Sequence, residues 1–261
     1  QRLYKSRLEM GRSPRTVRHI NEVLRNALGQ AVRWQLIPQN PAERVKPPQV
    51  VKLSMKRQFL TFEEAQAWLR SIQGHPLETL FLAAIFTGMR KSELLGLPWA
   101  NVDLERGEVT VAQTVWIRKG GQIEFHWPKD KEARTIPLPP AVVAKLRAHR
   151  AQQAWKRRMA GDAWTDYGLV WTRDDGKPLR QEYAYRQLQR SLDAAGLKRI
   201  RFHDLRHSAA TLLLALGVPL KDVSEWLGHA GIEITADLYG HVLPDAHRQA
   251  ALKLEERLLG Q

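Results

Sequence analysis

The sequence predicts a mainly α-helical protein with one small antiparallel β-sheet, an α+β fold. Three observations predict it. Apolar residues recur at helical spacing over most of the 261 residues. Helix-start signals precede several of these stretches. Between residues 108 and 137, short β-prone runs separated by a glycine pair and a charged turn replace the helical pattern.

Residues 1–45 form the first part of the chain. Ser13 and Pro14 predict a helix start, because serine is a good N-cap and proline fits the first helical position. The helix is expected to end near Trp34, before two prolines that favour extended backbone. Its apolar stripe consists of Val17, Ile20, Leu24, Ala27, Leu28 and Ala31, and its arginines Arg15, Arg18, Arg25 and Arg33 lie off that stripe. We expect the end of a small basic helical domain whose first helices, with the natural N-terminus, are missing.

The positive charge is concentrated in the same part of the chain. Residues 1–57 carry 13 Lys and Arg against three Glu, a net charge of +10, whereas the remainder has a net charge of +4. This distribution favours a polyanionic partner such as nucleic acid. It does not favour a membrane, because no basic helix has a strongly apolar opposite face with Trp and Phe anchors. A basic protein without such a partner is the alternative.

A linker is expected at residues 46–57. This segment holds a Pro-Pro pair and no firm periodicity. Its basic residues Lys52, Lys56 and Arg57 could follow a DNA backbone. The alternative is an ordinary interdomain loop that contacts nothing.

Residues 58–261 are expected to form a second, larger domain. Thr61 and Glu64 make a capping box, which predicts a helix over 62–72. Further helices are expected at 76–87, 92–97, 140–159, 180–195, 203–216, 220–227, 233–239 and 245–258. Strands are expected at 108–117, 122–127, 134–137 and 169–172.

Composition excludes several classes of protein and site. The chain has no cysteine, so disulfides and thiolate metal sites are excluded, and a cytoplasmic protein is expected. No apolar stretch is long enough to span a membrane. We find no Walker loop, no zinc-spaced residues, no GxSxG elbow and no carboxylate cluster for two metals, so neither a cofactor nor a metal is expected. An enzyme of nucleic acid without metal ligands must stabilise phosphate charge with its own cations.

Three short motifs supply such cations and reactive groups. Arg90 follows a glycine at a helix end, and Glu93, three residues later, can orient its guanidinium. His203 and Arg206 lie three apart at a helix start, where a proton carrier and a bidentate phosphate ligand would share one face. His229 and Tyr239 follow, ten residues apart. Taken singly, these residues also fit ordinary structural roles, as helix caps, surface ion pairs or packed aromatics.

The motifs together resemble a known family. TGMRKSELLGLPW, PKDKEARTIPL, HDLRHSAATLLLALG and LGHAGIEITADLYGH, in this order, closely resemble the tyrosine recombinase (phage integrase) family. The resemblance covers nearly the whole chain. It implies that residues 58–261 are a catalytic domain and that 1–45 are the latter part of a core-DNA-binding domain.

The resemblance also assigns residues by position. Arg90 and Arg206 match the two catalytic arginines, His203 opens the HxxR box, and Tyr239 matches the nucleophile. His229 matches the His or Trp position ten residues before it. Lys129 matches the lysine of the β-hairpin, with Lys131 as the alternative.

The activity that the resemblance implies is site-specific recombination of double-stranded DNA through a 3′-phosphotyrosyl link, with no metal or ATP. A homotetramer on DNA, a monomer in free solution, accessory DNA-bending proteins and a nucleoid location in a prokaryote or phage are expected with it. Two alternatives remain: DNA relaxation by a type IB topoisomerase-like enzyme, and a non-catalytic DNA-binding regulator. The latter predicts loss of catalytic positions, and none is lost here.

Overall fold

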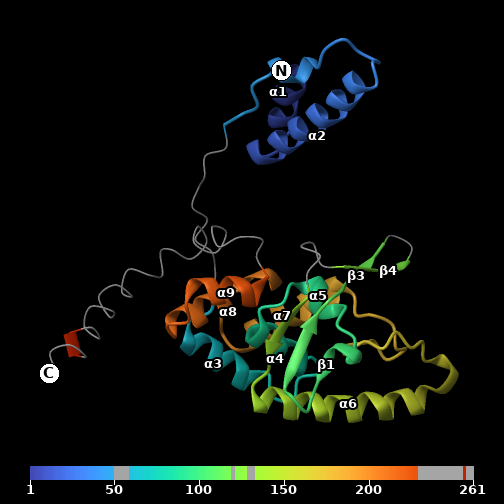
Figure 1. Cartoon of the computed structure of the whole chain (residues 1–261), viewed down its shortest axis with the longest axis vertical. Helices are drawn as coiled ribbons and strands as arrows, with labels where there is room; N and C mark the ends of the chain where they lie inside the picture. Colours follow the sequence, from blue (N-terminus) through green and yellow to red (C-terminus); the bar gives the residue numbers. More distant parts are fainter. Residues whose placement is uncertain (50–58, 119–120, 128–132, 229–254, 257–261) are drawn as a thin grey trace. The chain divides into compact units, whose positions relative to one another are not determined.

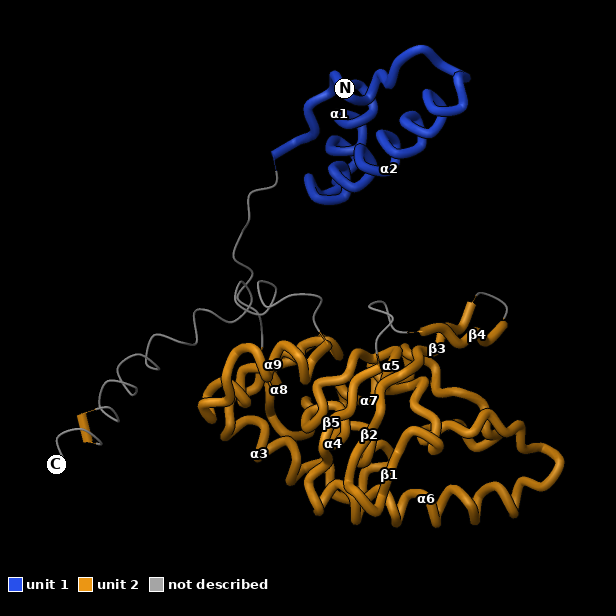
Figure 2. Tube along the Cα trace, viewed as in Figure 1, with its two compact units in different colours: residues 1–57 blue, residues 58–261 orange. Residues whose placement is uncertain are grey.

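The computed structural model describes residues 1–49, 59–118, 121–127, 133–228 and 255–256 (Figure 1). The chain divides into two compact units, Gln1–Arg57 and Gln58–Gln261 (Figure 2). None of the helices in the described ranges is long and apolar enough to cross a membrane.

The first unit is a small helical one. It consists of α1 (Arg2–Glu9), α2 (Pro14–Arg33) and the 3₁₀ turn η1 (Pro41–Arg44). The predicted start of α2 is confirmed, because the Ser13 side chain accepts a hydrogen bond from the backbone N–H of Thr16 at 3.2 Å. Helix α1 is fixed to α2 by the Tyr4 hydroxyl, which donates to the buried amide oxygen of Asn21 at 2.7 Å.

Helices form most of the second unit. The described ones are α3 (Phe62–Ser71), α4 (Glu78–Thr87), α5 (Lys91–Leu95), α6 (Pro140–Ala160), α7 (Gln181–Ala194), α8 (Phe202–Ala215) and α9 (Leu220–Leu227), with 3₁₀ turns η2 (Trp99–Asn101) and η3 (Gly161–Ala163). The predicted capping box at the start of α3 is present, with both the Thr61 and the Glu64 hydrogen bonds formed. The helices expected at 233–239 and 245–258 lie outside the described residues, apart from 255 and 256, which are helical.

Helix α4 lies at the centre of this unit. Seven of its ten residues are buried, and it packs against α5, α6 and α8. Two indoles fix its surroundings: Trp171 donates to the Thr79 hydroxyl at 3.0 Å, and Trp68 of α3 donates to the Ser191 hydroxyl of α7 at 2.9 Å. Buried indoles whose N–H groups have partners make a rigid core. The C-terminal end of α4, where the motif that contains Arg90 begins, is therefore rigidly supported.

The strands are short and antiparallel. They are β1 (Val102–Asp103), β2 (Glu108–Val111), β3 (Thr114–Ile117), β4 (Ile123–His126) and β5 (Arg134–Pro137). Strands β1, β2 and β5 form one sheet in that order, with Val109 opposite Ile136, and β3 pairs with β4. The predicted fold class, mainly α with a small amount of antiparallel β-structure, is confirmed.

The expectation of a single sheet is wrong in the described part of the chain. The sequence predicts one strand over 108–117, but this run breaks after Val111 into β2 and β3, which belong to different sheets. At the break the Gln113 side chain donates to the carbonyl of Gly96 at 2.7 Å. Strand β3 packs against α5 instead of joining the sheet of β1, β2 and β5 (Figure 1).

The prediction of a strand at 169–172 is also wrong. The segment is buried, but it forms only isolated bridges, from Leu169 to Pro98 and from Thr172 to Pro178. Side chains of α6 occupy its carbonyls instead: Gln153 donates to those of Leu169 and Val170, each at 3.1 Å. A run of apolar, aromatic and β-branched residues therefore gave a strand-like pattern without a strand partner.

Candidate active site

The site begins at the glycine that ends α4. Gly88 has φ +61°, a left-handed conformation that an L side chain rarely adopts. A Cβ at this position would lie 2.6 Å from Leu227 Cδ2, at the end of α9. The glycine therefore allows α4, α8 and α9 to meet closely just before Arg90.

Arg90 and Glu93 form the contact that the sequence predicts. The Arg90 backbone N–H donates to Glu93 Oε2 at 2.9 Å, and its guanidinium Nη1 donates to Oε1 at 2.8 Å. The Glu93 side chain is fully buried, whereas the Arg90 side chain is partly exposed. The other guanidinium nitrogen, Nη2, donates to the carbonyl of Gly228 at 2.9 Å. The contact is confirmed, and the role of Glu93 in orienting Arg90 stays a prediction.

Arg206 reaches the same turn from α8. It is buried, and its Nη1 donates to the carbonyl of Gly88 at 2.9 Å. The indole of Trp226 donates to the preceding carbonyl, that of Thr87, at 3.2 Å. The last carbonyls of α4 are thus satisfied by side chains from α8 and α9. The two predicted arginines are brought to one turn of the chain, although 116 positions separate them in the sequence.

His203 lies one turn before Arg206 on α8. Its ring is exposed and meets the buried ring of His207 edge-on, with centroids 4.9 Å apart. Partial desolvation lowers the pKa of His203, and the positive charges of Arg206, Arg201 and Arg90 act in the same direction against Asp204. A neutral His203 can accept a proton at neutral pH.

One member of this cluster is missed by the sequence-based prediction. Arg134, the first residue of β5, donates to Glu93 Oε2 at 2.7 Å and to Oε1 at 3.3 Å. Its Nε also donates to the carbonyl of Trp226 at 3.0 Å. The sequence carries only a weak signal for it, because an arginine at the start of a short strand is usually solvated. Glu93 thus lies between two guanidinium groups.

Three predicted catalytic residues lie outside the described part of the chain. These are Lys129, His229 and Tyr239, together with the alternative Lys131. Two described residues close to them in sequence belong to the cluster. Gly228 directly precedes His229 and accepts from Arg90, and Arg134 lies five positions after Lys129.

The predicted DNA-binding residues of the first unit are solvent-facing where they are described. Arg15, Arg18, Arg25 and Arg33 are all exposed on α2. A hollow of about 570 Å³ in this unit is lined by Glu22, Arg25, Asn26, Gly29, Arg33, Asn40 and Glu43. Lys52, Lys56 and Arg57 lie outside the described residues.

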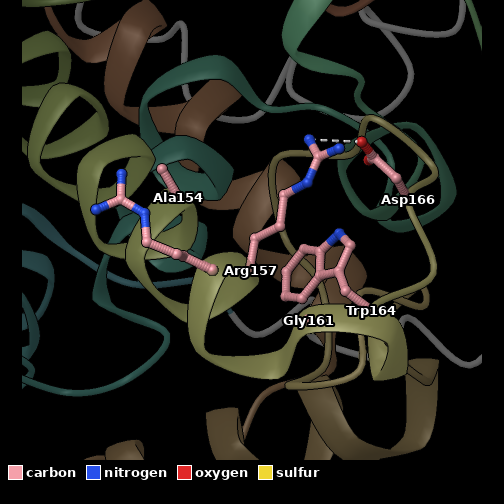
Figure 3. A pocket seen from close by; sticks show the side chains of 6 residues that line it. Ala154, Arg157, Gly161, Trp164 and Asp166 are labelled. Carbon is pink, nitrogen blue, oxygen red and sulfur yellow. Dashed lines mark ion pairs between the residues drawn. The ribbon is translucent and has the colours of Figure 1, made fainter.

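A separate cavity of about 400 Å³ lies in the second unit. Its lining comes from the end of α6 and the loop that follows: Ala154, Arg157, Arg158, Gly161, Trp164 and Asp166. Arg157 reaches across to Asp166, with 2.8 Å between Nη1 and Oδ2, beside the indole of Trp164 (Figure 3). None of the predicted catalytic residues in the described ranges lines this cavity.

Comparison with known proteins identifies the family of this chain. The profile of the Phage integrase family matches residues 58–245. A tyrosine recombinase XerC-like protein of Caldanaerobacter subterraneus is 33% identical over 98% of this chain and 70% of its own length. An integrase of Streptomyces ambofaciens is 32% identical over 87% of this chain and 60% of its own length. The chain thus spans between 60% and 70% of the length of these two relatives.

The solved structures agree in fold. The Tn1549 transposon integrase, in complex with a circular intermediate DNA, superposes with a TM-score of 0.78 at 20% identity and covers 96% of this chain and 82% of its own. A lambda integrase dimer bound to a core site superposes with a TM-score of 0.62. With a matching family profile over most of the chain and a relative at 33% identity, the chain belongs to the phage integrase family and is a tyrosine site-specific recombinase.

Proposed function

We propose that this recombinase cleaves double-stranded DNA with Tyr239 and that Arg90 and Arg206 bind the scissile phosphate. His203 accepts the tyrosine proton, and Lys129 supplies a proton to the leaving group. His229, which follows Gly228, completes the site. Glu93 orients Arg90.

The proposed chemistry balances without a cofactor. The Tyr239 oxygen attacks the phosphorus, the bond to the 5′-oxygen breaks, and that oxygen takes the proton from Lys129. The product is a 3′-phosphotyrosine and a free 5′-hydroxyl. A 5′-hydroxyl of a second strand then attacks the phosphotyrosine and gives its proton to Lys129, while Tyr239 leaves and regains its proton from His203. Since the phosphoester bond is exchanged rather than hydrolysed, the energy for rejoining is retained in the protein link.

The single observation that carries this proposal is the convergence of two arginines on the turn at Gly88. Arg206 binds the Gly88 carbonyl, and Arg90 leaves the same turn two residues later. His203 lies within the electrostatic reach of both. Guanidinium groups held in advance stabilise the charge of a pentacovalent phosphate without reorganising during the reaction.

Tyr239→Phe tests the proposed nucleophile. Nicked DNA, from which the released strand diffuses away, traps the covalent complex, and denaturing electrophoresis measures it. The wild-type chain should form an adduct, and the variant should form none while binding the same DNA with similar affinity. A denaturant-resistant adduct with Tyr239→Phe would show that another residue is the nucleophile.

The partner and the assembly belong to the same proposal. We propose that residues 1–45 are the latter part of a core-DNA-binding domain, that 46–57 are a basic linker, and that 58–261 are the catalytic domain. The related structures solved with DNA support double-stranded DNA as partner. We propose a monomer in solution, a homotetramer on two DNA sites, accessory DNA-bending proteins, and action at the nucleoid in a prokaryotic cytoplasm. Sedimentation with and without DNA distinguishes the monomer from the tetramer.

A further inference from the structure

Arg134 contacts three elements that lead to predicted catalytic residues. It begins β5, five positions after Lys129. Its guanidinium forks onto both oxygens of Glu93 in α5, the helix that Arg90 precedes. Its Nε donates to the carbonyl of Trp226 at the end of α9, three positions before His229. Only 12% of the side chain is exposed, so Arg134 faces these elements rather than solvent.

The charge of Glu93 depends on this contact. Burial opposes the ionised carboxylate and would raise the pKa of Glu93, but the hydrogen bond and charge of Arg134, with the help of Arg90, lower it overall. Without Arg134, the buried carboxylate would have Arg90 as its remaining cationic partner among the described residues. The Glu93 carboxylate would then neutralise the positive charge of Arg90, which is proposed to bind the phosphate. With Arg134 present, two guanidinium groups share one carboxylate, and the cluster keeps a net positive charge.

The end of α9 is fitted to the same guanidinium. Gly228 has φ +65°, and a Cβ there would lie 2.9 Å from Arg134 Cδ and Nη1 and 3.0 Å from Cζ. The backbone therefore passes directly over the Arg134 side chain. Arg134 and Arg90 also bind carbonyls of this helix end, those of Trp226 and Gly228. Cations at this position are favoured by the helix dipole.

We infer that Arg134 is a positioning residue for recombination: it keeps Glu93 from neutralising Arg90, and it fixes the end of α9 from which His229 follows. This inference rests on the proposed function of Arg90 at the scissile phosphate. Arg134 itself does not touch the DNA. Its effect on catalysis passes through Glu93 and through the backbone at Gly228.

A double-mutant cycle tests the charge argument. Arg134→Met, Glu93→Gln and the combined variant are compared with the wild type by single-turnover cleavage of nicked DNA between about pH 5.5 and 8.5. Arg134→Met should slow cleavage roughly 10- to 100-fold near pH 7, as is typical for groups that orient a reacting one. The combined variant should cleave faster than Arg134→Met alone, because a neutral amide does not compete for Arg90.

The pH profile separates positioning from a merely structural role. In Arg134→Met the deficit relative to wild type should shrink as the pH falls, since protonation of Glu93 releases Arg90. In the combined variant the deficit in cleavage rate should stay the same as the pH falls, because glutamine has no proton to gain. Additive losses in the cycle, with one constant deficit at every pH, would overturn the inference.

A matched control and a conservative variant complete the test. Arg199 forks onto Asp193 on an exposed surface, with 69% of its side chain accessible, so Arg199→Met should leave cleavage unchanged. Arg134→Lys keeps the charge and should recover part of the rate. If Arg134→Met weakened DNA binding more than Arg199→Met and the added Glu93→Gln did not restore it, Arg134 would be a DNA contact and the inference would be wrong.

Failure of this inference can be distinguished from failure of the proposed function. A wild-type chain that forms no adduct, or an adduct that survives Tyr239→Phe, contradicts the proposed function. A wild-type chain that forms the Tyr239-dependent adduct, with an Arg134→Met variant of equal rate, contradicts only the role of Arg134. Circular dichroism of each variant at the assay temperature confirms that it is folded.

Discussion

The two proposed phosphate ligands differ in how the fold holds them. Arg206 is buried, with one nitrogen on the Gly88 carbonyl, and the Arg90 side chain is 27% exposed. A buried guanidinium with a backbone partner has lost most of its rotamer freedom in advance. It needs little further ordering when a phosphate arrives. His203 is more exposed than Arg206, as befits a group that must exchange protons with a substrate.

The pH dependence of cleavage should reflect His203. Partial desolvation and the neighbouring arginines lower the pKa of His203 from its ordinary 6.5, which favours the neutral ring at pH 7. The second-order rate constant at subsaturating nicked DNA reports the free enzyme, and it should fall only as the pH drops below 6.5. His203→Gln should lose this acid limb and roughly 100- to 10,000-fold in rate.

If the rate constant fell with a midpoint at or above pH 6.5, the assignment of His203 as the proton acceptor would be contradicted.

The stability of the fold should depend on pH in the same direction as the rate of cleavage. Because the unfolded histidine binds a proton more readily, the contribution of His203 to the free energy of unfolding is lost as the pH falls below 6.5.

At this scale the sequence identifies the residues whose chemistry is visible in a motif. Arg90, Glu93, His203 and Arg206 are predicted from it. The structure brings the two arginines to one turn, with Glu93 bound to Arg90 and His203 one helical turn before Arg206. Arg134 is missed because its importance depends on a carboxylate 41 positions away, which no local pattern displays. The positions of Lys129, His229 and Tyr239 stay predictions, because they lie outside the described residues.

The junction of α4, α8 and α9 is the element on which the site depends. Gly88 ends α4 in a left-handed conformation, and Leu227 of α9 and Ala209 of α8 fill the space that a side chain would need. The carbonyls at this end are bound by Arg206 and Trp226. Close packing here therefore fixes both arginines relative to one another.

Gly88→Ala should disrupt this junction. The left-handed backbone disfavours alanine by about 1 to 2 kcal/mol, and the clash with Leu227 should add about 1 to 3 kcal/mol. Gly217→Ala is the matched control, since Gly217 also ends a helix with positive φ, at +83°, but has nothing within 4 Å of the added Cβ. Urea unfolding of both variants measures the difference. Equal destabilisation would contradict the close contact at Gly88.

Helices are predicted better than strands, for a physical reason. A helix satisfies its backbone within one segment, so its caps and apolar period are local; the starts of α2 and α3 show this. A strand needs a partner, and the segment 169–172 pairs with side chains of α6 instead. The break between β2 and β3 depends on a hydrogen bond from Gln113 to the distant Gly96. Neither is visible in the local sequence.

Across the whole molecule, charge and chemistry belong to different parts of the chain. The first 57 residues carry most of the excess positive charge, and the proposed catalytic residues that the structure describes all belong to the second unit. The arginines of α2 are exposed, so their charges are open to a partner. Such a division favours DNA affinity from one unit and bond exchange from the other.

Removing the α2 arginines should change affinity more than chemistry. Replacing Arg15, Arg18, Arg25 and Arg33 by alanine should reduce the slope of log K against log salt by about one for every phosphate that is no longer bound. Titrations of double-stranded DNA between about 50 and 200 mM salt measure this slope. Single-turnover cleavage at saturating DNA should be nearly unchanged. An unchanged slope would show that these arginines do not meet the phosphates.

The hydrogen bond from Arg90 to Gly228 limits how far Tyr239, the proposed nucleophile, can lie from the arginines. The carbonyl of Gly228 is held by Arg90, and the chain reaches Tyr239 only eleven positions later. Covalent geometry limits such a stretch to about 40 Å when fully extended. The proposed nucleophile is therefore covalently tethered within this distance of the Gly228 carbonyl that Arg90 binds. Within a bound protomer, attack becomes a first-order event whose rate depends on the tether and not on how much protein is added.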